Sequence, residues 1–144
     1  MKLGLITSIL DGMTFEEVVD FAAENGLECL EVACWPREKA TRRYAGVSHI
    51  DVDTLTPEKA EQIKAYCEKK GVEISSLAYY PNPLDPDTEK RERYIAHLHK
   101  LIDASALLGV NMITTFIGRD SKKNVSENLE LVKEIWPPIL KHAE

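Results

Sequence analysis

Side chains that could bind a small hydroxylated molecule lie within or just after short apolar segments of the chain. A carboxylate accepts hydrogen bonds from hydroxyl groups, an aromatic ring packs against the C–H face of a sugar, and a planar guanidinium binds phosphate or carboxylate groups. Five candidate binding residues follow this pattern: Glu31, Trp35, Tyr80, Asn82 and Arg119. The sequence does not indicate which residue is catalytic, and no Ser-His-Asp or Cys-His pairing is visible at these positions.

Each candidate also has a structural explanation that the sequence leaves open. Glu31 could belong to an internal ion pair, because a buried carboxylate needs partners for structural reasons alone. Trp35 could close the apolar core, and Asn82 could stabilise a turn between its two flanking prolines. Arg119 could pair with the adjacent Asp120. Tyr79 and Tyr80 should point to opposite sides, because successive side chains of a strand alternate.

The histidines offer one candidate metal cluster. His49, Asp51 and Asp53 alternate along one stretch, so their side chains could converge if the backbone is extended. We favour the interpretation that this stretch is a surface lid, and we expect residues 1–144 alone to bind no metal. The remaining three histidines are interpreted as exposed to solvent: His97, His99 and His142.

The segments that carry these residues repeat with one layout. Gly26, Gly71 and Gly109 each end a helical pattern and precede Leu or Val, a polar residue and a short apolar run. Glycine suits the left-handed end of a helix, and such a run suits a strand buried on both faces. The pattern predicts strands near residues 2–8, 29–35, 73–79 and 111–117. Four helix-start signals accompany them, at Thr14, Thr56, Asp87 and Asn124, and Pro137 with Pro138 should kink the last helix. Apolar residues at helical spacing predict which faces of the third and fourth helices turn inward: Ile95, Leu98, Ile102 and Ala106 in the third, and Leu129, Val132, Trp136 and Leu140 in the fourth.

Strands that alternate with helices predict an α/β fold with a parallel sheet. Both an open flavodoxin-like sheet and a closed barrel satisfy this order. The turn after the first strand contains a single glycine, Gly12, so it lacks the glycine-rich loop of a nucleotide-binding sheet.

The strand-end motifs resemble those of the xylose isomerase-like sugar phosphate isomerases and epimerases. The resemblance is carried in order by GLECLEVACWP at 26–36, by residues 49–53, by YYPNPLDPD at 79–87 and by TFIGRD at 115–120. It implies a (β/α)8 TIM barrel, of which this chain supplies the first four β-α units. Residues 1–144 would then form the N-terminal half of one domain.

The resemblance also implies a chemistry for the intact protein. Members of that family interconvert aldoses and ketoses, or epimerise ketoses, by proton transfer through an enediolate. They use a divalent metal (Mn, Mg, Co or Zn) whose ligands lie on the fifth and later strands. An inosose-type dehydratase, a lyase of the same fold, remains an alternative, as does a non-catalytic half-barrel that acts as an assembly module. The DNA-repair endonuclease of this superfamily carries histidines at the ends of its third and fourth strands, where this chain has none.

Composition limits the partners and the compartment. The formal net charge of −6 and the dispersed basic residues argue against nucleic acid. No membrane span or signal peptide is predicted, and three cysteines without a CxxC pair indicate reduced thiols in the cytoplasm. The expected partner is a sugar or sugar phosphate. A half-barrel with open edges should also self-associate.

Overall fold

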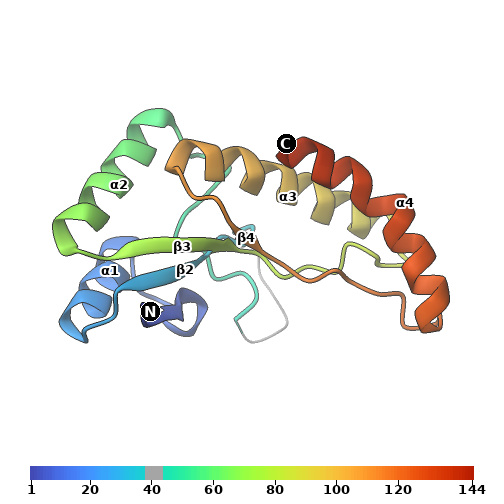
Figure 1. Ribbon diagram of the computed structural model, residues 1–144, viewed down its shortest axis with the longest axis horizontal. Coiled ribbons are helices and arrows are strands. Elements are labelled where there is room, and N and C mark those ends of the chain that lie inside the picture. Colours follow the sequence, from blue (N-terminus) through green and yellow to red (C-terminus); the bar gives the residue numbers. More distant parts are fainter. Residues whose placement is uncertain (38–43) are drawn as a thin grey trace.

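The four apolar segments form four parallel strands that pair side by side in the order of the chain. The computed structural model describes residues 1–37 and 44–144 and contains β1 (Gly4–Ile6), β2 (Cys29–Ala33), β3 (Glu73–Ala78) and β4 (Ile113–Thr114). Their order in the sheet is β1-β2-β3-β4, and all three pairs are parallel (Figure 1). This sequential order excludes the flavodoxin-like alternative, in which the first strand lies between the second and the third.

A helix follows each strand and begins at the predicted cap. The helices are α1 (Phe15–Glu24), α2 (Pro57–Lys70), α3 (Thr88–Leu108) and α4 (Val125–Ala143), and a short 3-10 turn, η1 (Thr7–Ile9), follows β1. Capping boxes start α1 at Thr14 and α4 at Asn124. Gly71 and Gly109 end α2 and α3 with φ angles of 70° and 67°, in the left-handed region that glycine adopts without strain.

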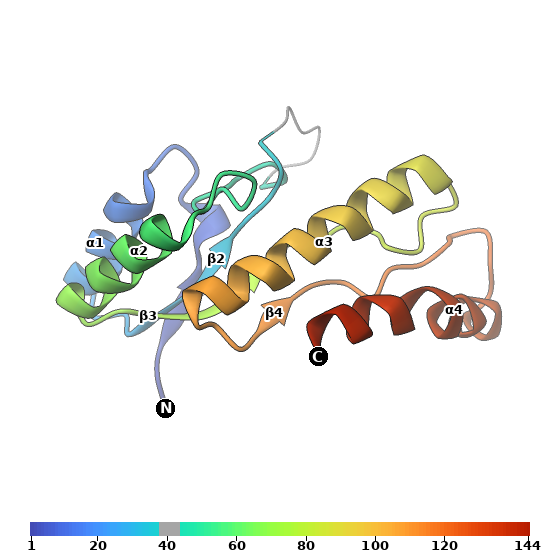
Figure 2. The same ribbon diagram turned by 90° about the horizontal axis from the view of Figure 1, so that it is seen from above.

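The first three helices cover one face of the sheet. Leu30, Val32 and Cys34 point to this face from β2 and the residue that follows it, and all three are fully buried. They pack against buried residues of the three helices: Val18, Val19, Ala22, Ala60, Cys67, Leu98, Leu101 and Ala104. Figure 2 shows α1, α2 and α3 side by side along this layer, and α4 packs against α3. Helices on a single face of sequential parallel strands are typical of a section of a β/α barrel.

A bulge in β3 determines which residues face away from the helices. The pairing of β2 with β3 shifts between Leu30 and Glu31, so Leu30 lies beside Ile74 whereas Glu31 lies beside Ser76. Ser75 is the additional residue, and its hydroxyl donates to the carbonyl oxygen of Leu30 at 3.0 Å. The bulge therefore places a serine hydroxyl next to the Glu31 carboxylate on the helix-free face.

All four strands are shorter than predicted, and the two outer strands are shortened most. β1 spans three residues because the chain turns into η1 at Thr7, whose hydroxyl accepts a hydrogen bond from the backbone N–H of Ala33 at 2.9 Å. β4 spans two residues, and β3 is its partner strand. The outer sides of β1 and β4 have no strand partner among the described residues.

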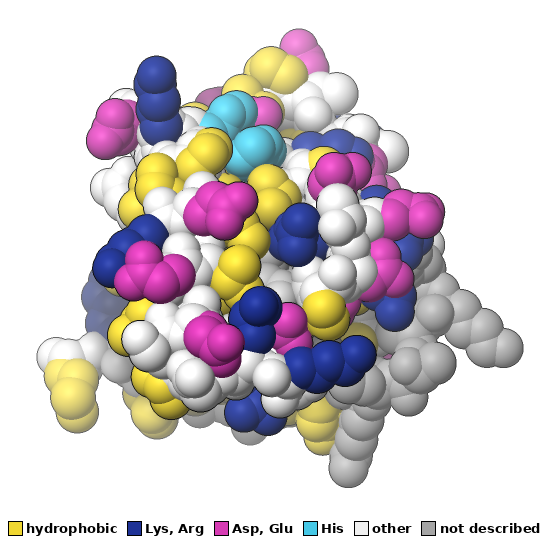
Figure 3. Space-filling view, turned by 90° about the vertical axis from the view of Figure 1, so that its right-hand side faces the viewer, with side chains coloured by type: hydrophobic (Ala, Val, Ile, Leu, Met, Phe, Trp, Pro, Cys, Tyr) yellow, Lys and Arg dark blue, Asp and Glu magenta, His cyan; other side chains and the backbone are white. Residues whose placement is uncertain are grey.

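The last helix follows its prediction in part. α4 changes direction in its C-terminal part, which contains Pro137 and Pro138 (Figure 1). Leu129 and Leu140 were expected to face the core but are exposed, whereas Ile139 is buried. Figure 3 shows the molecule from the right-hand side of Figure 1, the side on which α4 lies. Hydrophobic side chains are exposed on this surface among charged ones. No helix among the described residues has the length and apolar character that a membrane span requires.

The interpretation of His97 as solvent-exposed is wrong. Its side chain is 5% exposed, and its Nε2–H donates to the carbonyl oxygen of Cys34 at 2.8 Å. The ring also meets the Tyr79 ring edge to face. His99 is partly buried, with an Nε2 atom that has no hydrogen-bond partner in the described structure, and its ring stacks on that of His142.

The buried histidines predict that the fold is less stable in acid. Burial lowers the pKa of His49 and of His97 below the ordinary value of about 6.5. The unfolded chain therefore takes up protons that the folded chain resists, and the free energy of unfolding should fall as the pH drops below about 6.5. Urea denaturation at several pH values between about 7.5 and 5 measures this decline. A free energy of unfolding that does not change over this pH range would contradict the prediction.

Candidate functional site

Glu31 and Tyr80 meet on the face of the sheet that the helices leave open. The Tyr80 hydroxyl donates to Oε1 of Glu31, and the Ser76 hydroxyl donates to Oε2 at 3.4 Å. Burial, followed by the hydrogen bond to Glu31, raises the pKa of Tyr80, so the phenol keeps its proton at neutral pH. No cation pairs with Glu31 in the described structure, so the internal ion pair considered for this residue is not observed there.

Trp35 and Tyr79 lie on the opposite side of the strands, toward the helices. Tyr79 is 1% exposed and Trp35 is half-buried, and their rings meet edge to face with centroids 4.9 Å apart. The predicted alternation of Tyr79 and Tyr80 is therefore confirmed. Trp35 packs against the hydrophobic core and does not line the recess where the other candidates gather.

His49 ties two loops together, so its interpretation as part of a surface lid is wrong. The His49 side chain is buried, with Nδ1 2.9 Å from Oγ1 of Thr7 and Nε2 3.3 Å from the carbonyl oxygen of Leu10. A carbonyl oxygen only accepts, so Nε2 carries the proton and Nδ1 accepts from the Thr7 hydroxyl. The same hydroxyl oxygen accepts from Ala33 N–H. This chain of bonds fixes the turn after β1 against the end of β2.

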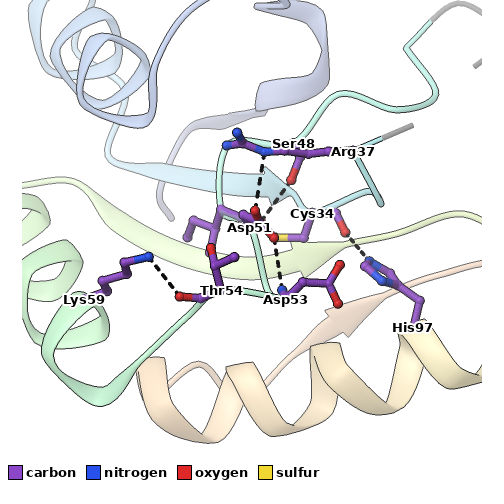
Figure 4. A network of polar contacts seen from close by, with 9 residues as sticks. Cys34, Arg37, Ser48, Asp51, Asp53, Thr54, Lys59 and His97 are labelled. Atoms are coloured by element: carbon purple, nitrogen blue, oxygen red, sulfur yellow. Dashed lines mark hydrogen bonds and ion pairs between the residues drawn. The ribbon is translucent and has the colours of Figure 1, made fainter. Parts of the chain in front are cut away.

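The neighbouring aspartates point to different partners. Asp51 faces Arg37 at 3.7 Å (Figure 4), whereas Asp53 pairs with Lys100 of α3. The lysine and its hydrogen bond lower the pKa of Asp53. His49, Asp51 and Asp53 therefore do not converge. Within residues 1–37 and 44–144, no three His, Cys, Asp or Glu side chains gather closely enough to hold a metal ion, so the described residues do not fit the divalent metal that the resemblance implies.

Asn82 and Arg119 meet where β3 and β4 end. Asn82 bonds the backbone of Arg119 at two points, and Gly118 packs against the Asn82 side chain. The recess at this place has a volume of about 430 Å³ and is lined by Tyr80, Pro81, Asn82, Phe116, Ile117, Gly118 and Arg119. Three of the five candidates thus share one recess, and Glu31 adjoins it through its bond to Tyr80.

Three contributors to this arrangement are missing from the sequence prediction. Ser76 could not be chosen over Ser75, because the bulge alone decides which of them lies beside Glu31. Phe116 follows β4, and its ring lies 4.8 Å from that of Tyr80. Thr7 gives no sequence signal of its own. The resulting site combines a carboxylate, a phenol, an aromatic wall and a guanidinium, a set suited to a hydroxylated ligand.

Comparison with known proteins agrees with this architecture. Residues 19–144 match a family model described as xylose isomerase-like TIM barrel. The uncharacterized protein YfiH of Bacillus subtilis (strain 168) is 29% identical over 146 residues, which cover 98% of this chain and 44% of YfiH. The D-psicose 3-epimerase of Clostridium cellulolyticum H10, crystallised with D-tagatose, superposes with a TM-score of 0.71 at 18% identity, over 99% of this chain and 48% of that chain.

Two further structures show the same fold. The AsbF protein of Bacillus anthracis, described as the probable 3-DHS dehydratase, has a TM-score of 0.64 at 21% identity, over 99% of this chain and 49% of that one. The IOLI protein, with a bound zinc atom, has a TM-score of 0.67 at 13% identity, and the superposition covers 100% of this chain and 48% of the IOLI chain. The chain spans about half the length of these relatives, so it has the architecture of the first four β-α units of a barrel. It belongs to the xylose isomerase-like TIM-barrel family.

Proposed function

We propose that the protein to which these residues belong is a sugar isomerase or epimerase. The observation that carries this proposal is the carboxylate of Glu31, which lies on the open face of the half-barrel and is held by Tyr80 and Ser76. The superposition on a D-psicose 3-epimerase supports it. The reaction would remove a proton next to the carbonyl group of the sugar and return it at the neighbouring carbon or on the opposite face.

In this proposal residues 1–144 form one wall of the substrate pocket. Glu31 accepts a hydrogen bond from a sugar hydroxyl, and Tyr80 keeps the carboxylate oriented while presenting its ring to the sugar. Asn82 and Arg119 close the wall at the end of β4. We assign the base that removes the proton to no residue of this chain, and Trp35 stays a more distant candidate because its ring packs on the core side.

We propose that the activity depends on a divalent metal whose ligands lie outside the described residues. The IOLI protein binds zinc in the same fold, which supports metal use in the family. Treating the active protein with a chelator should lower its turnover of ketoses at least about tenfold, and Mn²⁺ or Co²⁺ should restore it. Assaying ketoses and their phosphates with and without chelator measures this loss. Full activity in metal-free protein would contradict the proposed dependence.

A dehydratase is the second candidate function, and the similarity to AsbF favours it specifically. The same assay separates the two reactions, because an isomerase or epimerase conserves the mass of the sugar whereas a dehydratase releases one water. A non-catalytic assembly module would turn over no sugar.

The absence of any disulfide among Cys29, Cys34 and Cys67 supports a reducing compartment such as the cytoplasm.

A further inference from the structure

The guanidinium of Arg119 has no partner among the described residues. Arg119 is exposed at the end of β4, and the hydrogen bonds of this residue come from its backbone. The neighbouring Asp120 was the expected partner, but it is only 7% exposed, and its Oδ1 accepts from the backbone N–H of Lys122 at 2.9 Å. The local ion pair that would explain Arg119 structurally is therefore not formed.

The backbone of Arg119 is nevertheless held firmly. Oδ1 of Asn82 accepts from Arg119 N–H at 2.8 Å, and Nδ2 of Asn82 donates to the Arg119 carbonyl oxygen at 2.9 Å. Asn82 is itself confined between Pro81 and Pro83, both buried. These two bonds join the loop after β3 to the loop after β4 and fix where the arginine side chain begins.

Gly118 makes this close contact possible. Its φ angle is +85°, a left-handed conformation that favours glycine, and a Cβ atom at this position would lie 2.6 Å from Oδ1 of Asn82. The chain thus brings two loops into tight contact at the residue before Arg119. Such a fixed backbone lowers the ordering cost of ligand binding, a feature expected of a binding residue.

The recess beside Arg119 limits what the guanidinium would bind. Tyr80 and Phe116 supply aromatic rings with centroids 4.8 Å apart, and Glu31 bonds to the Tyr80 hydroxyl. Rings and a carboxylate suit the body of a sugar, whereas an unpaired guanidinium suits an anionic group. A phosphate ester carries close to two charges and three acceptor oxygens, which match the guanidinium fork.

We propose that Arg119 binds the phosphate group of a phosphorylated sugar and that Asn82 positions Arg119 for this contact. The proposal rests on the proposed sugar-binding function and narrows its substrate class to phosphorylated sugars. Arg119 is then a specificity residue that touches substrate. Asn82 acts through it, because its amide is already engaged by the Arg119 backbone.

The test compares a phosphorylated sugar with its neutral counterpart on the full-length native protein. Calorimetry with fructose 6-phosphate and with fructose gives a dissociation constant for each. Arg119→Gln should weaken fructose 6-phosphate binding about tenfold to hundredfold and change fructose binding less than about twofold. The dissociation constant of Arg119→Lys for fructose 6-phosphate should lie between those of the native protein and Arg119→Gln, because lysine keeps the positive charge but lacks the planar guanidinium fork. Arg93→Gln replaces an exposed arginine of α3 and is the matched control. It should change neither the dissociation constant for fructose 6-phosphate nor that for fructose.

Asn82→Ala tests positioning by the same ratio. It should selectively weaken fructose 6-phosphate binding, whereas a merely structural role would weaken both sugars together. Circular dichroism confirms that each variant is folded. Equal losses for both sugars in Arg119→Gln, or no loss, would overturn the proposal, and tighter binding of a sugar carboxylate than of the phosphate would overturn the phosphate assignment.

Failure here is distinguishable from failure of the proposed function. If neutral ketoses are interconverted and Arg119→Gln changes nothing, the isomerase proposal stands and the phosphate site is rejected. If no sugar is turned over but inorganic phosphate binds in an Arg119-dependent manner, the anion site stands and the isomerase proposal is rejected.

Discussion

Replacing Glu31 by alanine should lower kcat/KM of the intact protein on the order of 100-fold, the largest loss of activity that we expect from this chain. A charged acceptor that bonds a substrate hydroxyl contributes about 1.5–3 kcal/mol, and its removal also frees the Tyr80 and Ser76 hydroxyls to move. The measurement is steady-state kinetics on the sugar that the protein turns over. It tests whether the carboxylate touches substrate or only holds its neighbours.

The matched controls separate these two roles. Ser76→Ala removes only the longer of the two bonds to Glu31 and should lower kcat/KM less than about tenfold. Tyr80→Phe removes the hydrogen bond from the Tyr80 hydroxyl and keeps the ring. Its loss of kcat/KM should therefore lie between those of Ser76→Ala and Glu31→Ala. If Glu31→Ala lowers the free energy of unfolding but leaves kcat/KM near the wild-type value, Glu31 is structural and the proposed contact is wrong.

The sequence predicted the order of elements because their signals are local. Capping residues such as Thr14 and Asn124, and glycines such as Gly71 and Gly109, act within one turn of the chain, and all four perform the predicted role in the structure. Parallel pairing in sequential order followed from the repeat and the resemblance. The exact strand ends were not predicted, because β1, β2 and β4 stop two or three residues before the predicted ends.

The helix faces were predicted less well, and α3 shows why. The predicted stripe ran through Ile95, Leu98, Ile102 and Ala106, and of these four Leu98 alone is buried. The other buried residues of α3 form the row His97, Leu101, Ala104 and Leu108. This row has the spacing of one helix face, but it begins with a histidine, which hydropathy assigns to solvent. A carbonyl acceptor on Cys34 makes that burial tolerable, and no local pattern reveals such an acceptor.

The details of the site depend on contacts between distant segments. The bulge at Ser75 decides which serine meets Glu31, and the Asn82 amide turns to the backbone of a loop 37 residues away. The sequence marks Asn82 as a polar residue between prolines, but only the packed loops reveal its partner. Residue types at strand ends were thus predictable, whereas their division into ligand-facing and backbone-holding groups was not.

A polypeptide made of residues 1–144 alone should self-associate, because its surfaces lack partners. The outer sides of β1 and β4 are unpaired in the described structure, and apolar side chains are exposed beside β4 at Met112, Phe116 and Ile117. Open strand edges and exposed apolar patches pair readily with other chains. Two copies could satisfy both edges at once, because β4 of one copy can pair in parallel with β1 of the other around a two-fold axis along the barrel.

Multi-angle light scattering over a concentration series should therefore give the mass of a dimer or a larger species for this polypeptide. Ile117→Lys should shift the equilibrium toward monomer, since a charge beside an open edge opposes strand pairing and burial of the apolar patch. Val125→Lys is the control, because Val125 is also exposed but lies at the start of α4. A stable monomer at every concentration, or equal effects of the two lysines, would mean that the edge of β4 does not drive association and that residues 1–144 fold without covering it.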